Sequence, residues 1–492
     1  MKSIKKFVAL GLAALLALSV AACGEDTTQG GTDTASNNGS SDSTSSKREF
    51  VIGSWWRQYY DSTDENMDVS VDWTNAQDTG DEDEATLAEH AINRQIAQLK
   101  WDRVAYLEEK YNCTFKWVNL TYEGTKDSIN TSIVAGSPDC DIYMIDTSMA
   151  IPAQANGFLT DLKTILPADS DLFTDQTVFS YLDLGDGQAC ILKVQGGLSN
   201  TYPLAFNKQM LEAAGLEDPR DLWDKGEWTW DKFIEYCQAL TQDTDGDGQI
   251  DQYGYCGYQT ETLQGLLWGN GATIAGGTTQ TLTSAEVGEC LQMLQDMYLT
   301  YNVCYPYDFS DAASDSMRIQ YMQGNVAFFP TAVWIQNAQG NYTAGGDNNL
   351  TWDTVYVQWP VGPSGDASTN ASWNSADGNF FVIPAGVKDP ETVYNFLYDL
   401  YNYFDGDTAL RDDPATANWW YNETALDEEL KASNWDVQLY CLNHPGFDIW
   451  ASLNDSIDLW SLMDGTMTPA QVQETYKDSL QNSLDLTFGT AN

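Results

Sequence analysis

The sequence predicts an α/β fold organised as two lobes. Of its 492 residues, about 445 follow a polar N-terminal segment that ends at Lys47. A chain of that length exceeds what one hydrophobic core supports. Segments with helical spacing of apolar residues alternate with short β-rich runs, a pattern that predicts parallel sheets flanked by helices.

The first elements form a strand, helix, strand unit. Residues 50–55 are predicted to form a strand, and the acidic, aperiodic residues 61–85 a surface insertion. A long helix is predicted over 87–111, because its apolar residues recur at helical spacing. The β-rich residues 114–120 then complete the unit.

The alternation continues through the middle of the chain. A helix is predicted near 126–135, followed by the breaker sequence Gly136-Ser137-Pro138 and a buried strand over 141–145. Further helices are expected over 208–214 and 284–298.

The last helix has a clear start signal. Thr468 is placed to cap it, Pro469 suits its first turn, and Gln471 is the partner in a capping box. Its buried stripe is predicted to consist of Val472, Tyr476, Leu480 and Leu484.

Another well-marked helix leads into a possible metal loop. Thr229 is a suitable cap, and one apolar face follows at helical spacing, comprising Trp230, Phe233, Ile234, Cys237 and Leu240. The residues after it, TQDTDGDGQID, resemble a calcium loop of the EF-hand type.

Oxygen ligands in this loop have the spacing that a hard cation requires. Asp243, Asp245, Asp247, Gly248 and Asp251 fill its first, third, fifth, sixth and ninth positions, and the backbone carbonyl of Gln249 fills the seventh. Gly254 stands at the twelfth position, where a bidentate Glu is usual, so a remote carboxylate would have to complete the shell. We expect a structural calcium ion rather than a calcium sensor, because no second such loop is visible. The alternative is an acidic turn without metal.

The N-terminus has the features of an export signal. Lys2, Lys5 and Lys6 precede the apolar residues 7–20, a run shorter than the about 20 residues of a membrane-spanning helix. Val20-Ala21-Ala22-Cys23 resembles the bacterial lipoprotein cleavage box, so residues 1–22 are predicted to be the signal and Cys23 the lipidated first residue. The alternative is an ordinary secretory peptide. Residues 23–47 would then be a disordered tether that holds the body about 25 to 30 Å from the membrane.

Composition narrows the function classes. The net charge is −49, and loss of the three signal lysines leaves 20 basic and 72 acidic residues, a charge of −52. Such a surface repels nucleic acid and anionic lipid. Because the chain holds only His90 and His444, it has little material for a His-rich zinc site or a Ser/His/Asp triad. The eight cysteines after Cys23 show no paired spacing, and we expect most of them to be buried free thiols.

Several segments, in their order and spacing, resemble extracellular solute-binding proteins of carbohydrate ABC importers, the maltose-binding-protein-like family in its lipoprotein form. They are SWWRQYY, GSPDCDIYMID, PLAFNKQMLEAAGLEDP, GEWTWDKFIEYCQALTQDTDGDGQIDQYGY, GNVAFFPTAVW, and WPVGPSGD followed by FVIPAGVKDPETVYNFL. The sequence departs from the family pattern in the acidic insertion and in the Trp-rich residues 419–460.

The resemblance implies a periplasmic-binding-protein-like fold, in which two α/β lobes are joined by crossing strands and close by hinge bending over a ligand in the interlobe cleft. Crossings are expected near 193–195, near Phe329 and near Ala376. The first lobe would then comprise residues 48–194 and 330–375, and the second residues 195–329 and 376–492. No enzymatic activity is implied. The implied partners are a carbohydrate, most simply an oligosaccharide, and the permease subunits, with a monomeric protein at the extracellular face of the cytoplasmic membrane.

Aromatic residues commonly line the cleft of this family, and carried over they are Trp55, Trp56, Trp268, Trp334 and Trp373. Sugar rings pack on aromatic planes while their hydroxyls need fixed polar partners. For that reason Asn270, in the sequence WGNG, joins the expected ligand-binding set. Trp55 and Trp56 cannot both face the cleft if the strand continues through them. The alternative for each Trp is an ordinary core position.

Two other classes of protein fit the same surface location. One is a tethered glycan-degrading enzyme, for which pairs of carboxylates are uninformative because 72 acidic residues produce such pairs by chance. The other is an adhesin or a binding protein for a peptide or another non-sugar solute. Turnover of a labelled oligosaccharide would identify the enzyme, whereas saturable binding without products would identify the receptor.

Overall fold

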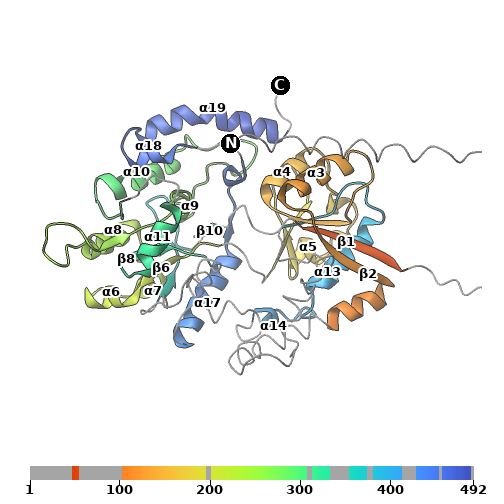
Figure 1. Cartoon of the computed structure of the whole chain (residues 1–492), viewed down its shortest axis with the longest axis horizontal. Helices are drawn as coiled ribbons and strands as arrows, with labels where there is room; N and C mark the ends of the chain where they lie inside the picture. Colours follow the sequence, from red (N-terminus) through yellow and green to blue (C-terminus); the bar gives the residue numbers. More distant parts are fainter. Residues whose placement is uncertain are drawn as a thin grey trace, which may run out of the picture. The chain divides into compact units, whose positions relative to one another are not determined.

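The described residues of the computed structural model form two large β-sheets, each flanked by helices, and a two-stranded ladder of β10 and β12 (Figure 1). It describes residues 47–54, 102–195, 201–306, 313–332, 354–368, 370–373, 380–412, 428–453 and 457–488. Among these residues, no helix combines the length and the apolar character needed to cross a bilayer.

The first sheet defines the first lobe and has the strand order β2-β1-β3-β11-β5-β4. β1 pairs in parallel with β2 and β3, whereas β11 runs antiparallel to both β3 and β5. Its elements are β1 Arg48–Ser54, β2 Cys113–Asn119, α3 Tyr122–Ser132, β3 Ile142–Ile145, α4 Thr147–Ala155, η1 Leu162–Thr164, α5 Asp171–Thr174, β4 Phe179–Tyr181, β5 Ile191–Val194, β11 Phe380–Val382, α13 Pro390–Tyr401 and α14 Thr408–Asp412.

The second sheet defines the second lobe and has the order β7-β8-β6-β9. Here β6 is antiparallel to both of its neighbours, and only β7 and β8 are parallel. The elements around this sheet are β6 Leu204–Asn207, α6 Lys208–Ala213, α7 Pro219–Asp224, α8 Trp230–Leu240, β7 Tyr253–Tyr255, α9 Gln259–Gly269, α10 Ala285–Leu299, α11 Ala313–Met322, β8 Val326–Pro330, β9 Thr354–Val357, β10 Ser372–Trp373, α17 Glu428–Asn443, β12 Pro445–Gly446, η2 Ile449–Ser452, α18 Leu459–Met463 and α19 Pro469–Thr487.

The α/β class and its helix and strand alternation are confirmed. The expectation of parallel sheets holds for β2, β1 and β3, but the second sheet is mainly antiparallel. Of the long helix predicted over 87–111, residues 102–110 lie in the described part and are helical. The predicted insertion at 61–85 lies outside it.

The strand pairing corrects the predicted lobe boundaries. β9, placed in the first lobe with residues 330–375, pairs with β6 of the second sheet, and Leu204 lies opposite Val357. β11, placed in the second lobe with residues 376–492, lies between β3 and β5 in the first sheet. The chain does change sheets between β5 and β6, as expected near 193–195. It also changes lobe between β10 and β11, on either side of Ala376, as expected, although there it returns to the first lobe. Phe329, by contrast, lies within β8 rather than at a crossing.

The two predicted caps form as expected. The Thr229 side chain accepts a hydrogen bond from the Lys232 backbone N–H at the start of α8. At α19, Thr468 and Gln471 make the reciprocal hydrogen bonds of a capping box. In the predicted stripe of α19, Val472, Leu480 and Leu484 are buried and Tyr476 is half-buried.

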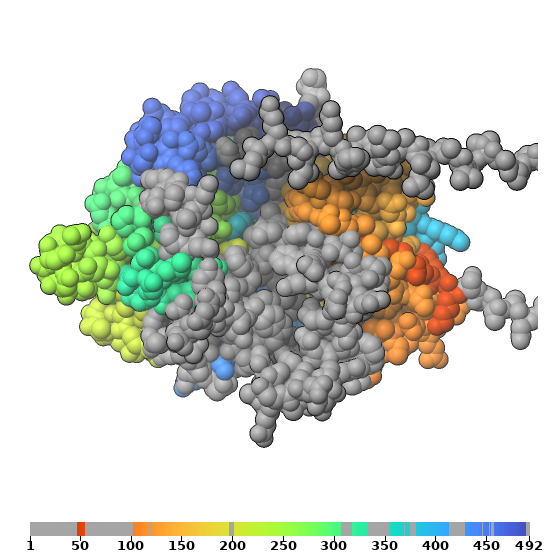
Figure 2. Space-filling model, viewed as in Figure 1, coloured from red at the N-terminus to blue at the C-terminus, as the bar shows by residue number. Residues whose placement is uncertain are grey.

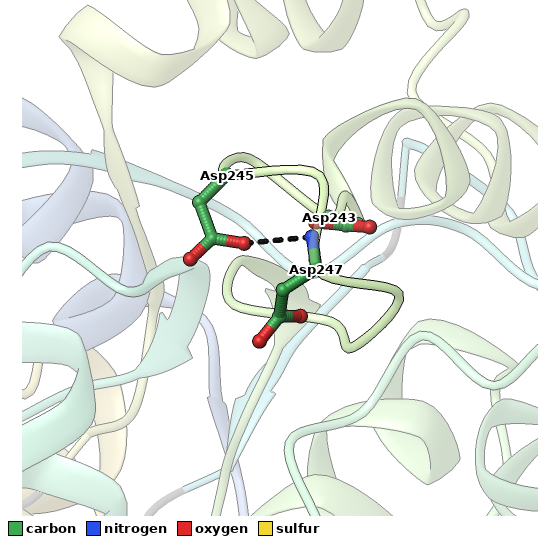
Figure 3. Close-up of side chains that lie close together, drawn as sticks. All are labelled: Asp243, Asp245 and Asp247. Atoms are coloured by element: carbon green, nitrogen blue, oxygen red, sulfur yellow. Dashed lines mark hydrogen bonds between the residues drawn. The ribbon is translucent and has the colours of Figure 1, made fainter.

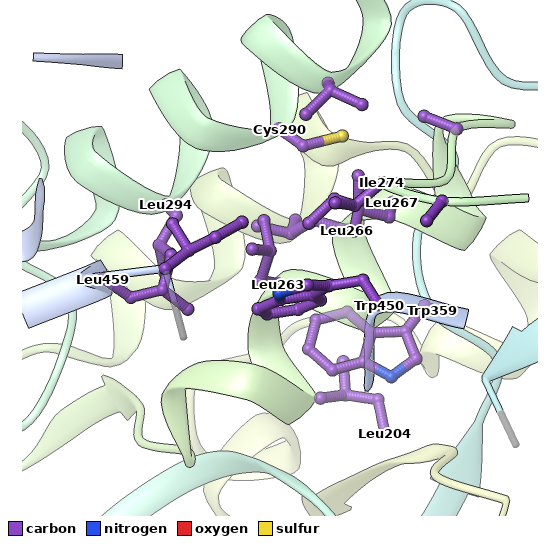
Figure 4. Close-up of a cluster of buried hydrophobic side chains, with 14 of the residues drawn as sticks. Leu204, Leu263, Leu266, Leu267, Ile274, Cys290, Leu294, Trp359, Trp450 and Leu459 are labelled. Carbon is purple, nitrogen blue, oxygen red and sulfur yellow. The ribbon is translucent and has the colours of Figure 1, made fainter. Parts of the chain in front are cut away.

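Helix α9 lies at the centre of the second lobe's core. Its leucines Leu263, Leu266 and Leu267 are fully buried among α10, α18 and β6 side chains (Figure 4). Between them Gly265 lies directly against the Trp359 ring, and a Cβ atom there would overlap the ring. This close contact fixes the position of α9, which carries one of the predicted ligand-binding residues.

The surface of the first lobe carries isolated ion pairs. In Figure 2 the atoms of β1, in red, lie beside the orange atoms of residues that follow position 101. Here Lys116 of β2 contacts the Glu49 carboxylate at 2.7 Å, with both side chains well exposed. Exposed pairs of this kind contribute little to stability.

All eight cysteines of the described part are buried and unpaired, which confirms the expectation of free thiols. Burial raises the pKa of the Cys140, Cys190 and Cys441 thiols to about 12. These thiols therefore remain protonated and unreactive at neutral pH, since the thiolate is the nucleophilic form.

Candidate functional site

Two of the predicted ligand-binding tryptophans meet at the short β10–β12 ladder. Trp373 lies in β10 directly opposite Gly446 of β12. Trp268 comes from the last turn of α9, and its ring lies so close to Gly446 that any side chain at that position would overlap it. Glycine at 446 therefore allows the Trp268 ring to pack on the strand that pairs with Trp373.

A third aromatic ring extends this cluster. Tyr202, in the segment that enters the second lobe just before β6, packs on Trp373 with ring centroids 5.0 Å apart and a 30° angle between the planes. We call Tyr202, Trp268 and Trp373 the aromatic cluster. Trp373 and Tyr202 are buried, while Trp268 is half-buried.

The indole nitrogens of Trp268 and Trp373 are buried but find no hydrogen-bond acceptor in the described part of the chain. Two core tryptophans of the second lobe have acceptors. Trp228 Nε1 donates to the Gln358 carbonyl and Trp359 Nε1 to the Tyr202 carbonyl, both at 2.9 Å. A buried donor without a partner costs about 1 to 3 kcal/mol, so unpaired donors concentrate where a ligand or water completes them.

Trp230 also has an unpaired indole nitrogen, but its ring packs against Gly362 within the core. Like the buried Trp228 and Trp359, it occupies an ordinary core position.

Sequence reasoning missed a polar residue beside the cluster. Gln264 precedes Trp268 by one turn of α9, and residues four apart share a helix face. Its amide is fully buried and lies beside the Asp448 carboxylate, where its hydrogen bonding opposes the raised pKa of that carboxyl, while its side-chain oxygen finds no donor among the described residues. An uncharged amide in a buried helix gives little indication of a binding role in the sequence. Tyr202 could have been identified as a candidate, because it lies next to the first predicted crossing.

Asn270 has a different role from the one predicted. It is fully buried, and its amide nitrogen donates to the Glu286 carbonyl and to Glu289 Oε2, at 3.1 and 2.9 Å. Its side-chain oxygen accepts from the Ser364 backbone N–H at 2.9 Å. Because these bonds use the amide to tie α9 to α10 and to the loop after β9, we withdraw Asn270 from the ligand-binding set.

The remaining predicted ligand-binding residues, Trp55, Trp56 and Trp334, lie outside the described residues.

The predicted metal loop connects α8 to β7 and brings three of its carboxylates together. Ligand oxygens of Asp243, Asp245 and Asp247 lie within 4.8 Å of one another on an exposed surface (Figure 3). Asp243 accepts hydrogen bonds from the Gly246 and Gly248 backbone N–H groups at 2.7 and 2.8 Å. Both glycines have positive φ, at 80° and 93°, which lets the loop turn tightly around Asp243.

Asp251 does not join this carboxylate cluster. Its Oδ2 accepts from the Thr244 backbone N–H and hydroxyl, at 2.9 and 3.0 Å, and these bonds lower the pKa of Asp251. A bridge between Gln242 and Gln252 closes the base of the loop. The three carboxylates that lie together are the oxygen ligands that a hard cation prefers. Asp251 stabilises the loop through its hydrogen bonds with Thr244.

Comparison with known proteins places the chain in a family. Residues 102–403, more than half of the chain, match the family model described as bacterial extracellular solute-binding protein. The fold resembles that of a maltose/maltodextrin-binding domain from Bdellovibrio bacteriovorus bound to maltotriose, with 14% identity, a TM-score of 0.51, and coverage of 89% of this chain and 99% of that one.

Two further structures are similar to the same degree. An ABC substrate-binding protein from Listeria monocytogenes in complex with cycloalternan has 15% identity and a TM-score of 0.53, covering 90% of this chain and 99% of the other. A cyclic α-maltosyl-1,6-maltose binding protein from Arthrobacter globiformis has 15% identity and a TM-score of 0.54, with 89% and 99% covered. At these identities the likeness establishes the two-lobed fold, and the match of the family model establishes membership: the chain belongs to the bacterial extracellular solute-binding proteins.

Proposed function

We propose that the protein captures an oligosaccharide without transforming it and delivers it to the permease of an ABC transporter. The observation that carries this proposal is the aromatic cluster with its two unpaired indole N–H groups. A sugar offers C–H faces for the rings and hydroxyl oxygens as acceptors for the N–H groups. Family membership supports an extracellular solute receptor, and three proteins of similar fold bind maltotriose, cycloalternan and a cyclic maltosyl-maltose.

In this proposal the second lobe supplies Trp268 and Trp373 as the sugar-binding surface. Trp55 or Trp56 and Trp334 keep their proposed role in clamping the sugar when the hinge closes. An aromatic side chain that covers a sugar face contributes about 1 to 3 kcal/mol, and each unpaired N–H gains a hydrogen bond on binding.

Replacing Trp268 by Ala should weaken oligosaccharide binding by about ten- to a hundredfold, because the ring and its N–H are both lost. Trp268→Phe keeps a ring but removes the donor, so it should lose only part of that affinity. Isothermal titration of both variants with the same sugar measures the difference. Trp228→Phe, in the core beside Phe233, is the control, and its affinity should match the wild type. Unchanged affinity in a folded Trp268→Ala protein would remove Trp268 from the site.

Membrane attachment through a lipid on Cys23 is a further part of the proposal, and it rests on the signal pattern and the polar tether. Cys23→Ser should release the protein from cells into the medium, since no lipid can be added to serine by the same thioether chemistry. Fractionation and labelling with a lipid precursor measure this. A Cys23→Ser protein that stays in the membrane fraction and still incorporates the precursor would contradict lipid anchoring at this residue.

Calcium binding by the α8–β7 loop is also proposed. Asp243, Asp245, Asp247 and the Gln249 carbonyl would hold the ion, with Asp251 as the fourth predicted carboxylate. The support is the three gathered carboxylates, whose mutual repulsion a cation would relieve. When bound, the ion would tie the end of α8 to the start of β7.

Chelation should lower the melting temperature of wild-type protein, because an ion that binds only the folded state stabilises it in proportion to the logarithm of its concentration over Kd. Asp245→Ala should melt at the same temperature with and without chelator. The matched control is Asp366→Ala, which removes an exposed carboxylate that accepts a turn hydrogen bond from the Ser368 N–H at 2.8 Å. If Asp245→Ala responds to chelator as strongly as the control does, the loop is not the calcium site.

A further inference from the structure

Lys193 is a buried amine without a partner. It lies on β5, opposite Phe380 of β11 and Ser180 of β4. The stem of the side chain is partly exposed, but Nζ is sealed from solvent and has no hydrogen-bond partner among the described residues. Side chains directly opposite each other lie on one face of a sheet, so Lys193 shares its face with Phe380 and, one strand further, with Ile145.

The described side chains that pack around Lys193 from α4 are uncharged. Helix α4 packs against β5 and β11, and its buried side chains Met149, Ala150 and Ile151 join the same apolar cluster as Ile145, Ile191 and Phe380. The α4 sequence TSMAIPAQA contains no charged residue. The carboxylate that caps α4, Asp146, accepts hydrogen bonds from Met149 N and Ser148 Oγ.

An unpaired buried ammonium is costly, and it is conspicuous in a chain with 72 acidic and 23 basic residues. Lys110 and Lys116 of the first lobe pair with the carboxylates of Asp399 and Glu49, and Lys163 donates to the Gly187 carbonyl. Desolvation lowers the pKa of Lys193 to about 8, so the amine is mainly protonated at neutral pH. Because its charge is costly and no described residue pairs with it, this amine suits an anion that a ligand supplies.

The position of Lys193 in the sheet is the one where ligands bind. β1 and β3 run in parallel and end at Ser54 and Ile145, and Lys193 is level with Ile145 through Phe380. In open α/β sheets, ligands bind outside the carboxyl ends of parallel strands. Lys193 therefore lies at the ligand-binding edge of the first lobe, and its flexible stem lets the ammonium turn toward a bound group.

We propose that the captured sugar is acidic and that its carboxylate, as in a uronic acid residue, pairs with Lys193. This inference rests on the proposed function and adds the class of sugar. A lone ammonium pairs with an anion as a point charge, and a single carboxylate is the simplest group that such a pair requires; sulfate and phosphate are distinguished from it by the titration below. A singly charged carboxylate meets less repulsion from a strongly negative protein than a phosphate monoester, which carries a charge of about −2.

The test is a titration panel of uronic acid trisaccharides, each paired with its carboxyl-reduced neutral counterpart, against the wild type and Lys193→Met. The wild type should bind an acidic member at least about tenfold more tightly than its neutral partner, since truncating one side of a buried charge pair has effects of that size or larger. Lys193→Met should lose this preference while keeping its affinity for the neutral partner. The unliganded Lys193→Met protein should melt no lower than the wild type, because it no longer buries an unpaired cation.

Three results would overturn the inference. In the first, the wild type binds neutral members as tightly as acidic ones or more tightly. In the second, folded Lys193→Met retains the preference for the acid. In the third, sulfated or phosphorylated trisaccharides bind to the wild type more tightly than uronates do, and Lys193→Met abolishes this difference. Lys193 would then pair with a sulfate or phosphate group rather than with a carboxylate. If only neutral sugars bind, the preference for an acidic sugar is wrong but the proposed function stands. If no oligosaccharide binds, the acidic-sugar inference and the proposed function are both wrong.

Discussion

Gly265→Ala should destabilise the protein by about 2 kcal/mol or more. A Cβ at this position in α9 would overlap the Trp359 ring, which is 1% exposed and fixed by its hydrogen bond to the Tyr202 carbonyl. Overpacking of this kind costs about 1 to 3 kcal/mol and occasionally more. The gain from replacing a helical glycine is about 1 kcal/mol, too small to offset a rigid clash.

Equilibrium unfolding in denaturant measures this difference, and α10 offers a matched control. A Cβ at Gly288 would lie 3.2 Å from Gln473 Nε2, which donates to the Leu282 and Ser284 carbonyls, so this side chain would have to shift by only a few tenths of an ångström. Gly288→Ala should therefore cost much less than Gly265→Ala. Equal unfolding free energies for the two variants would contradict the packing described for α9.

Asp448→Ala should cost about 3 kcal/mol or more. The Asp448 carboxylate is fully buried and accepts hydrogen bonds from the backbone N–H groups of Ile274, Ala275 and Trp450, at 2.6, 2.9 and 3.0 Å. Removing it leaves three buried donors unpaired, at about 1 to 3 kcal/mol each. Asp448→Asn keeps one acceptor oxygen and should cost less, as denaturant unfolding of the two variants would show. An alanine variant as stable as the wild type would contradict this role.

The same residue predicts a pH dependence with an unusual sign. Burial raises the pKa of Asp448 to about 6 against the opposing backbone hydrogen bonds. Because the folded state holds this proton more tightly than the unfolded state does, the contribution of Asp448 to stability is greatest below about pH 4 and declines as pH rises to about 6. The stability difference between the wild type and Asp448→Asn should therefore shrink by about 2 to 3 kcal/mol over that range. A difference that is constant or grows with pH would contradict the raised pKa.

Local signals in the sequence predicted local structure well. The caps at Thr229 and Thr468 depend on residues within one turn, and both form. Strand partners depend on residues far apart in the chain, so the sequence did not reveal that β9 belongs with β6 or that β11 inserts between β3 and β5. The lobe boundaries were wrong for that reason, although the fold class was right.

Prediction of the site was limited in the same way, because contacts between residues distant in the chain were not visible in the sequence. The resemblance to the family led to Trp268 and Trp373, which the structure brings together at Gly446. Asn270 was misassigned because its partners Glu289 and Ser364 are distant in sequence. The missing partner of Lys193 could be recognised only from the packing of α4 over β5, since a lysine at the end of a strand is unremarkable in sequence.

The central claim, that this protein binds an oligosaccharide and releases it unchanged, is tested most directly by calorimetric titration of the protein lacking residues 1–47. A panel of mono- and oligosaccharides is titrated, and the sugar is recovered and analysed by chromatography. The account predicts saturable binding of at least one oligosaccharide, recovered intact after prolonged incubation. Cleavage products at a rate proportional to protein concentration, or no saturable binding by any sugar, would contradict it.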